Sequence, residues 1–215
     1  MALFKKENNK KENKDLITLE TLNEVLKKAS YETSLKLEEF FNQQIIFTDF
    51  KIFNIEINEI PLIVGNENEE VISVLINVEN ELAGKIIFLT TKESGENIIR
   101  ILTGKKKVNL VNKNGILTEI ARGSIENLAQ IFISTFISSI SNLLQKTIML
   151  SIPMISYSYK FAIINEFVYD IMESSDSLIL FSAKFKIEKE NIEGLFIYLP
   201  KDIKNIKIEQ WKNWK

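Results

Sequence analysis

A helical stretch in the second half of the chain carries the polar side chains best suited to position a partner or a water molecule. Residues 126–145, ENLAQIFISTFISSISNLLQ, are mostly apolar. Their amides and hydroxyls nevertheless recur at three- and four-residue steps, which places them along one narrow stripe of a helix. The stripe consists of Asn127, Gln130, Ser134, Ser138, Ser141 and Gln145. Such a stripe is either a solvated helix side or a surface that meets a partner.

The residue types that are missing narrow the chemistry. Among 215 residues there is no cysteine and no histidine. Their absence excludes disulfides, thiolate nucleophiles, Cys/His metal sites and every Ser-His or Cys-His catalytic arrangement. Any reaction must use carboxylates, amides, lysines, tyrosines, hydroxyls or a metal that a partner supplies. We therefore expect neither a metal site nor a cofactor of the chain's own.

Charge and hydropathy argue against two classes of partner. Lys and Arg number 27 against 29 Asp and Glu, so the formal net charge is −2. Because the scattered lysines are balanced by acids, we predict no nucleic-acid partner. No run approaches the ~18 apolar residues of a membrane span, so we predict no membrane insertion. The lack of cysteine fits a reducing cytoplasm.

A second amphipathic helix is predicted at 16–42, after a tail at 1–15 that we expect to be disordered. Its expected core-facing residues are Leu22, Leu26, Ala29, Leu37 and Phe40. Its expected exposed residues are Glu20, Glu24, Lys27, Tyr31, Ser34 and Glu38.

The other elements follow an order that occurs twice. After the first long helix we expect strands at 44–57, 71–80 and 85–91, then a short helix at 92–104 that ends at Gly104. After a polar connector at 105–115 we expect a long helix at 116–145, a strand at 148–158, a helix at 160–172, a second hairpin and a short helix or frayed tail at 201–211. The repetition predicts an α+β fold made of two halves, 16–104 and 116–215.

Two glycines support an internal duplication. The segment ENELAGKIIFLT (79–90) matches KENIEGLFIYLP (189–200), so that Gly84 falls on Gly194 and Leu82 on Ile192 at a constant offset. A glycine at the same place in both hairpins indicates a position where a Cβ would be costly. We expect a pseudo-two-fold arrangement with an antiparallel sheet and the two long helices side by side on one surface.

Two stretches carry a resemblance to a known family. The residues EVISVLINVENELAGKIIFLTTKESGENIIRILTG (70–104) resemble the strand-hairpin-helix of the CheC, CheX and FliY phosphatases of bacterial chemotaxis, including its LTG signature at Leu102-Thr103-Gly104. The residues NLAQIFISTFISSISNLLQKTI (127–148) resemble the second signature helix of that family. The resemblance covers about 16–208 and implies a CheC-like fold.

The resemblance also implies where the chemistry lies. In this family each long helix can carry Glu-x-x-Asn, in which the Glu pairs with a Lys of phosphorylated CheY and the Asn orients the attacking water. The response regulator supplies the Mg²⁺ and the phosphorylated Asp, so the phosphatase contributes positioning.

Both matching positions in this chain depart from the motif. On the first helix Glu24 keeps the acid, but Lys27 stands in place of the Asn, and Glu20 keeps a carboxylate four residues earlier. On the second helix Asn127 replaces the acid and Gln130 keeps an amide that is one methylene longer. A charged Lys cannot accept a hydrogen bond from water, whereas Gln can both donate and accept.

The register on the second helix stays open, because Glu126 is adjacent and Glu119-x-x-Arg122 has the same spacing. We prefer the Asn127/Gln130 register because it keeps the apolar run and the distance to the next strand in step. Partner-facing positions are then expected at Glu20, Tyr31, Ser34, Ser134 and Ser138.

The resemblance implies a CheC-like chemotaxis or flagellar-switch protein that binds CheY or motor proteins, with weak or lost phosphatase activity. Two alternatives remain: an active CheY-phosphate phosphatase that uses Asn127 and Gln130, and a structural subunit of the flagellar switch. A CheD partnership is not supported, since Ser158 stands where the family has an acid. The expected location is the cytoplasm, including the flagellar motor.

Overall fold

The computed structural model describes residues 19–56, 59, 68–80, 83–145, 147–172 and 177–201, which form an α+β fold. The predicted tail at 1–15 and almost all of the predicted segment at 201–211 lie outside these residues. The helices are α1 (Leu19–Phe41), α3 (Lys92–Thr103), α4 (Glu119–Leu144) and α5 (Lys160–Met172), with a short 3₁₀ turn, η2 (Glu188–Glu190). The strands are β1 (Ile46–Glu56), β2 (Glu70–Asn80), β3 (Gly84–Thr91), β4 (Ile148–Leu150), β5 (Met154–Tyr159), β6 (Ser177–Ile187) and β7 (Ile192–Pro200).

All strand pairs belong to one seven-stranded antiparallel sheet. Its order is β1-β6-β7-β3-β2-β4, and β5 also pairs with β2. The strand that follows α1 therefore joins the sheet beside β6, a strand of the second half of the chain. The two sequence halves interlock in this way within a single sheet.

The centre of the sheet confirms the predicted internal symmetry. Ile87 of β3 lies opposite Ile197 of β7, and the offset that matches Gly84 to Gly194 also matches these two isoleucines. A local two-fold axis therefore passes between them. On either side of β7 and β3 the order is the same, since β6 and then β1 on one flank correspond to β2 and then β4 and β5 on the other.

The matched glycines lie at opposite ends of this central strand pair. Gly84 is opposite Pro200 and Gly194 is opposite Thr90. A Cβ on Gly84 would lie 2.3 Å from the carbonyl oxygen of Leu199, and one on Gly194 would lie 2.2 Å from the Phe185 ring. Neither glycine has a positive φ, so close approach of neighbouring atoms requires them, as the repeat predicted.

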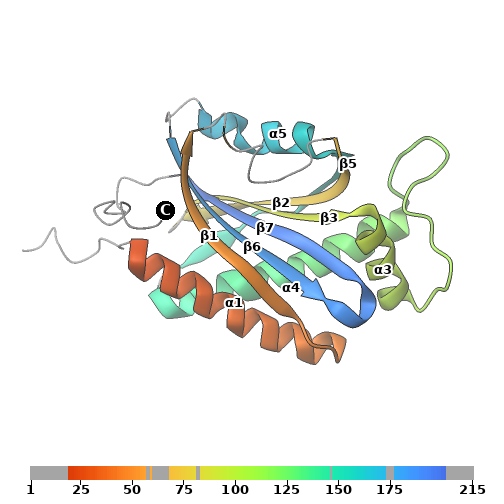
Figure 1. Ribbon diagram of the computed structural model, residues 1–215, viewed down its shortest axis with the longest axis horizontal. Helices are drawn as coiled ribbons and strands as arrows, with labels where there is room; N and C mark the ends of the chain where they lie inside the picture. The colour runs from red at the N-terminus through yellow and green to blue at the C-terminus, as the bar shows by residue number, and fades with distance from the viewer. Residues whose placement is uncertain are drawn as a thin grey trace, which may run out of the picture.

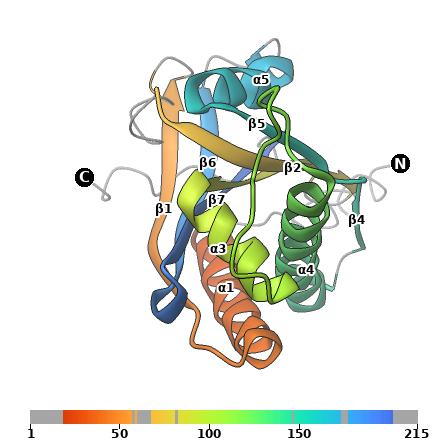
Figure 2. The same ribbon diagram turned by 90° about the vertical axis from the view of Figure 1, so that its right-hand side faces the viewer.

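The two long helices cover one face of the sheet and α5 covers part of the other (Figures 1 and 2). Successive side chains of each strand point to opposite faces of the sheet. In β3, Ile86 and Phe88 pack in the core beneath α1 and α4, whereas Ile87 and Leu89 pack with α5. The expectation that 16–42 and 116–145 lie side by side is confirmed, because α1 and α4 contact each other along their length.

Phe132 of α4 is the centre of the core beneath the helix pair. Its ring lies between 5.1 and 5.9 Å, centroid to centroid, from the rings of Phe47, Phe88, Phe185 and Phe196. Strands from both halves of the chain thus meet on one side chain of α4. Aromatic pairs at these distances contribute beyond their buried area.

Two sequence expectations need correction. The single strand predicted at 148–158 is split into β4 and β5. Pro153 has no backbone N–H to donate to a neighbouring strand. The side chain of Ser151 accepts a hydrogen bond from the backbone N–H of Asn77 at 2.9 Å, so this donor of β2 is satisfied where β4 ends. Phe40, expected in the core, is 53% exposed, because it lies on the last turn of α1.

None of the helices in the described part of the chain has the length and apolarity that crossing a membrane requires.

The core beneath α4 can be tested at Phe136, which is 1% exposed and packs edge to face on Phe196 at 4.6 Å. Phe136→Ala should lower the free energy of unfolding by about 3–5 kcal/mol, because a large cavity is left in a close-packed core. The matched control is Phe161→Ala on α5, where the ring is 48% exposed and the loss should stay below about 1 kcal/mol. Chemical denaturation measures both, and equal losses would mean that the assigned core is wrong.

Candidate functional site

The candidate site is the outer surface of the helix pair. Phe40 near the end of α1 and Asn127 near the start of α4 line the same depression, so the two helices run antiparallel. Glu24 and Lys27 lie near the opposite end of α1, about 20–24 Å from Phe40 at 1.5 Å per helical residue. The two degenerate motifs are therefore separate sites at opposite ends of the pair.

On α1 the structure places three of the predicted residues on the surface. Glu24 and Lys27 are exposed, and Tyr31 is 64% exposed. The side chain of Glu20 lies outside the described residues. With these side chains, the first site offers a carboxylate, an ammonium group and a phenol.

The predicted partner-facing residue Ser34 is instead buried, at 7% exposure. Its hydroxyl donates to the carbonyl oxygen of Tyr31 at 2.8 Å, and Ser30 and Thr33 donate in the same way to Leu26 and Ala29. Hydroxyls that bond to their own helix are satisfied without water. These small side chains therefore line the inner side of α1, and the sequence pattern misassigned Ser34.

On α4 the predicted stripe does reach the surface at most positions. Asn127, Gln130 and Ser138 are exposed, and Ser134 is half-buried and donates to the carbonyl oxygen of Ile131 at 3.2 Å. Glu126, the alternative acid, forms an i,i+4 ion pair with Arg122 at 3.6 Å. Asn127 and Gln130 are thus two neighbouring amides that are open to solvent.

A depression of about 700 Å³ runs along the first half of α4, and sequence reasoning did not find it. Its walls come from the end of α1, the end of α3 and four turns of α4. Its apolar side chains are Phe40, Leu102, Ile120, Leu128 and Ile131, and its polar ones include Glu119, Ser124, Asn127, Gln130 and Ser134. We call it the α4 groove. The predicted pair Asn127 and Gln130 lies on it.

Gly123 hollows the α4 groove. It sits inside α4, has no unusual φ, and a Cβ built on it would meet no atom within 4 Å. Glycine inside a helix costs about 1 kcal/mol relative to alanine, and nothing within the described chain requires it here. A glycine within a helix is the one signal in the sequence that could have indicated this groove, and it was not used in the sequence analysis.

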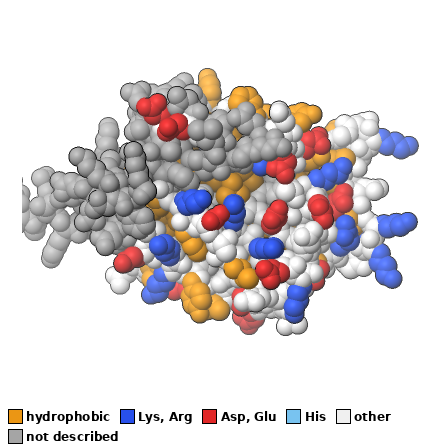
Figure 3. All heavy atoms as spheres, in the orientation of Figure 1, with side chains coloured by type: hydrophobic (Ala, Val, Ile, Leu, Met, Phe, Trp, Pro, Cys, Tyr) orange, Lys and Arg blue, Asp and Glu red, His pale blue; other side chains and the backbone are white. Residues whose placement is uncertain are grey.

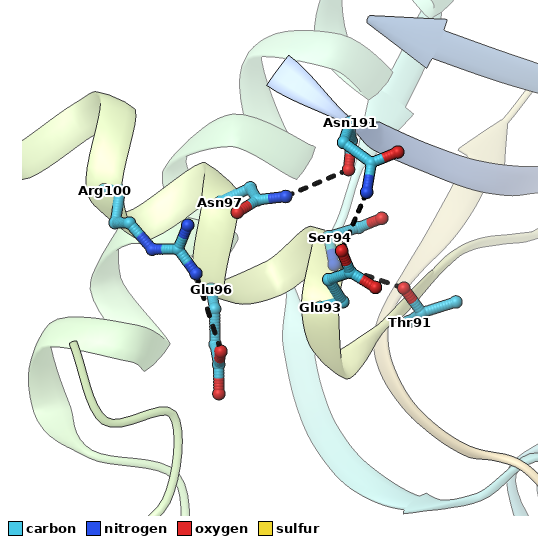
Figure 4. A network of polar contacts seen from close by, with 7 residues as sticks. All are labelled: Thr91, Glu93, Ser94, Glu96, Asn97, Arg100 and Asn191. Carbon is cyan, nitrogen blue, oxygen red and sulfur yellow. Dashed lines mark hydrogen bonds and ion pairs between the residues drawn. The ribbon is translucent and has the colours of Figure 1, made fainter. Parts of the chain in front are cut away.

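A polar network fixes α3, which forms one wall of the groove (Figure 4). Thr91 caps the helix by accepting from the Ser94 amide at 3.2 Å. The Asn97 amide group donates to the Asn191 carbonyl oxygen at 3.0 Å, and that of Asn191 donates to Glu93 at 2.7 Å. The first-half helix is thereby joined to the β6–β7 hairpin of the second half.

The perturbed titratable groups of the described residues lie on the sheet. Burial, followed by the hydrogen bond to Glu70, raises the pKa of Tyr157 to about 12. Burial also raises the pKa of Tyr198. The hydrogen bond and charge of Lys184 lower the pKa of Asp49. Both phenols are therefore uncharged at physiological pH.

The exposed side chains of this surface are suited to hydrogen bonding. The described residues include no group of three or more Asp or Glu placed to hold a metal ion. Two exposed amides at helical spacing can orient a water or a phosphate oxygen by hydrogen bonds.

Comparison with known proteins shows the fold. No family model and no curated protein matches the chain by sequence. Among solved structures, FliY from Thermotoga maritima aligns with a TM-score of 0.64 at 16% identity, over 86% of this chain and 91% of that one. FliM in a FliG–FliM complex from H. pylori gives 0.56 at 10% identity, over 87% and 95%. A CheX–CheY–BeF3–Mg complex from Borrelia burgdorferi gives 0.53 at 13% identity, over 82% and 96%. The chain has the fold of the FliY, CheX and FliM proteins.

The open space at Gly123 generates a stability test. Gly123→Ala should raise the free energy of unfolding by about 0.5–1 kcal/mol, because it adds helix propensity without a clash. Gly95→Ala in α3 is the matched control, since its Cβ would lie 2.2 Å from the buried Cδ1 of Ile72. Overpacking there should cost about 1–3 kcal/mol. Urea denaturation should give opposite signs, and a loss of stability at Gly123 would show that the groove is filled from within the chain.

Proposed function

We propose that this chain is a CheC-like chemotaxis or flagellar-switch protein that binds a CheY-like response regulator, or proteins of the motor, through the α1/α4 surface. The observation that carries the proposal is the exposed pair Asn127 and Gln130 beside an open groove. Long helices packed antiparallel on one face of a duplicated sheet present this pair outward. Binding is the function for which this surface is best equipped.

Weak or absent phosphatase activity follows from the side chains at the two sites. At the first, Lys27 is charged, cannot accept a hydrogen bond from water, and would repel a Mg²⁺ held by the regulator. At the second, Asn127 offers no charge to a Lys of the regulator. A charged hydrogen-bonded pair at a desolvated interface is worth about 1–3 kcal/mol, so docking in the catalytic orientation is weakened.

The proposal assigns Mg²⁺ and the phosphorylated Asp to the regulator, so the chain itself needs no cofactor. It includes no CheD partnership. Ser158, where an acid would be expected, is half-buried in β5 and pairs with Val71 of β2.

One observation favours an active phosphatase as second candidate. Gln130 is exposed, lies one turn from Asn127 and has both a donor and an acceptor. Its extra methylene lets the amide reach farther than that of Asn but leaves the amide's position less fixed. Positioning errors of about 1 Å can cost 10²-fold in rate. We therefore rank catalysis behind binding.

The deciding experiment combines binding and turnover. A cognate CheY-type regulator, with and without beryllofluoride and Mg²⁺, is titrated against the chain, and loss of the phosphorylated regulator is followed over time. Phosphorylation-dependent binding without faster dephosphorylation supports the proposal. Fast dephosphorylation supports the second candidate, and the absence of any binding leaves only a structural role in the switch.

Restoring the motif should return activity. Asn127→Glu with Gln130→Asn supplies the acid and the shorter amide at a spacing that α4 already has. Lys27→Asn supplies the missing amide beside Glu24, which is already in place. Each repaired protein should dephosphorylate the regulator at least about fivefold faster than the natural chain, because the regained interaction is worth ~1 kcal/mol or more. On α4 that interaction is the charge pair, and on α1 it is the hydrogen bond from the amide to water.

The matched control is Asn165→Glu on α5, which makes the same amide-to-acid change at an exposed helix position with no amide three or four residues later. It should leave the rate unchanged. If the natural chain is already fast and both repairs slow it, Asn127 and Gln130 form a working variant of the motif and the binding proposal is wrong.

A further inference from the structure

We propose that the α4 groove and the lysines of the adjoining connector together dock an acidic amphipathic helix of a partner protein. The inference rests on the proposed function in that Asn127 and Gln130 border the groove. It adds the chemistry of the partner segment: apolar side chains on one face and carboxylates beside them.

The shape of the groove fits an elongated occupant. Its lining runs along α4 from Glu119 to Ser134, which is about 22 Å at 1.5 Å per residue. A helix of four turns has the same length. Recognition of a helix in an apolar groove uses side chains at i, i+3 or i+4 and i+7 as anchors.

Five of the side chains that line the groove are apolar, and no part of the described chain covers the two most exposed of them. Phe40 is 53% exposed and Ile120 is 47% exposed, while Leu102 and Ile131 are half-buried. Large apolar side chains that gather in one concave place mark a binding surface more often than isolated ones do. Gly123 lies between them without a Cβ, so a partner side chain can reach the backbone of α4.

On the connector side of the groove the charge is positive, whereas the exposed Glu39 precedes Phe40 on the α1 side. Lys105, Lys106 and Lys107 follow directly on α3, whose Leu102 forms a wall of the groove. All three are exposed, and none forms an ion pair within 4 Å with a described residue. Figure 3 shows Lys and Arg side chains protruding at the end of the molecule where Figure 1 places the connector. Among the residues that line the groove there is one acid, Glu119. It lies in the first turn of α4, where the helix dipole favours a negative charge.

The connector holds these lysines in place. Before them, Gly104 closes α3 in the left-handed conformation. After them, Leu110 is buried, Val111 bridges to Leu117, and the Leu110 carbonyl oxygen accepts from the Thr118 amide at 2.9 Å. Anchored charges lose less entropy on binding than charges on a free loop. The basic cluster is thus a fixed complement for carboxylates.

Two other occupants are disfavoured by charge. A second copy of the chain would bring one lysine cluster against another if the two grooves faced each other, and like charges repel. Nucleic acid would need a broader basic surface, whereas the chain as a whole carries a net charge of −2. Of the three occupants, an acidic protein segment therefore matches the charge beside the groove best.

The test uses a fluorescent helical peptide of about four turns, with Leu at i, i+3, i+4 and i+7 and Glu elsewhere, and its counterpart with Lys in place of Glu. Gly123→Met fills the groove without a clash inside the chain, and a triple change, Lys105→Gln with Lys106→Gln and Lys107→Gln, removes the charge. Their matched controls are Asn142→Met, at an exposed position of the same helix outside the groove, and the triple change Lys51→Gln, Lys186→Gln and Lys189→Gln, all exposed away from the groove.

The Glu peptide should bind the natural chain and the Lys peptide should not. Gly123→Met and the connector triple should each weaken binding at least about tenfold, and the triple should also reduce its salt dependence. Both controls should stay within about twofold. Equal binding of the two peptides, or indifference to Gly123→Met, overturns the inference. Displacement of the Glu peptide by an RNA or DNA oligonucleotide overturns the choice of a protein partner.

A second arm separates this inference from the proposed function. Beryllofluoride-activated regulator is titrated against the natural chain and both groove variants. If the regulator binds all three equally, the groove is not its docking site and the inference fails while the proposed function stands. If the Glu peptide behaves as expected but no regulator binds, the groove is a docking site and the proposed function fails.

Discussion

The pairing of β3 with β7 is the constraint on which the rest of the molecule depends. It joins two interlocked halves into one sheet, and it requires the two strands to approach closely at both ends. Gly84 and Gly194 permit that approach, because a Cβ at either position would overlap neighbouring atoms by more than packing can absorb. The local two-fold axis between Ile87 and Ile197 then fixes where every other element lies. A change at this pair would therefore be felt on both faces of the sheet.

From this pairing follows the placement of the helices. Because the halves are related by a two-fold axis, their long helices land antiparallel on the same face, over the aromatic cluster around Phe132. The antiparallel arrangement brings the end of α1 to the start of α4 and so creates the α4 groove between Phe40 and Asn127. The polar network at Asn191 and Asn97 adds α3 as the remaining wall. The candidate docking surface is here a consequence of how the core is built.

Much of this fold could be predicted from the sequence, since alternation and helical periodicity report burial directly. The matched glycines predicted the repeat, and Gly104 predicted the end of α3. Three features could not be read in this way. Ser34 looks polar, but its hydroxyl is satisfied by its own helix, so it can be buried. Phe40 looks like core, but the helix ends beside a groove. The exchange that pairs β1 with β6 is a matter of topology, which the local pattern does not encode. At the site, Asn127 and Gln130 were placed on the surface correctly, whereas the groove required coordinates.

The two ends of the helix pair have diverged although the sheet beneath them is symmetric. At one end Glu24 and Lys27 stand exposed on α1; at the other, amides border a groove hollowed by Gly123 and flanked by fixed lysines. Catalysis and binding respond differently to such divergence. Orienting a water for attack demands side-chain positions good to a fraction of an ångström, so one lost acid or one added methylene removes most of it. Burial of apolar area is non-directional and scales with the area removed from water, so it survives polar substitutions at the rim. Under the proposed function, a surface without the catalytic pair keeps its partner through the apolar area of the groove, and we infer from the lysines beside the α4 groove that this partner is acidic.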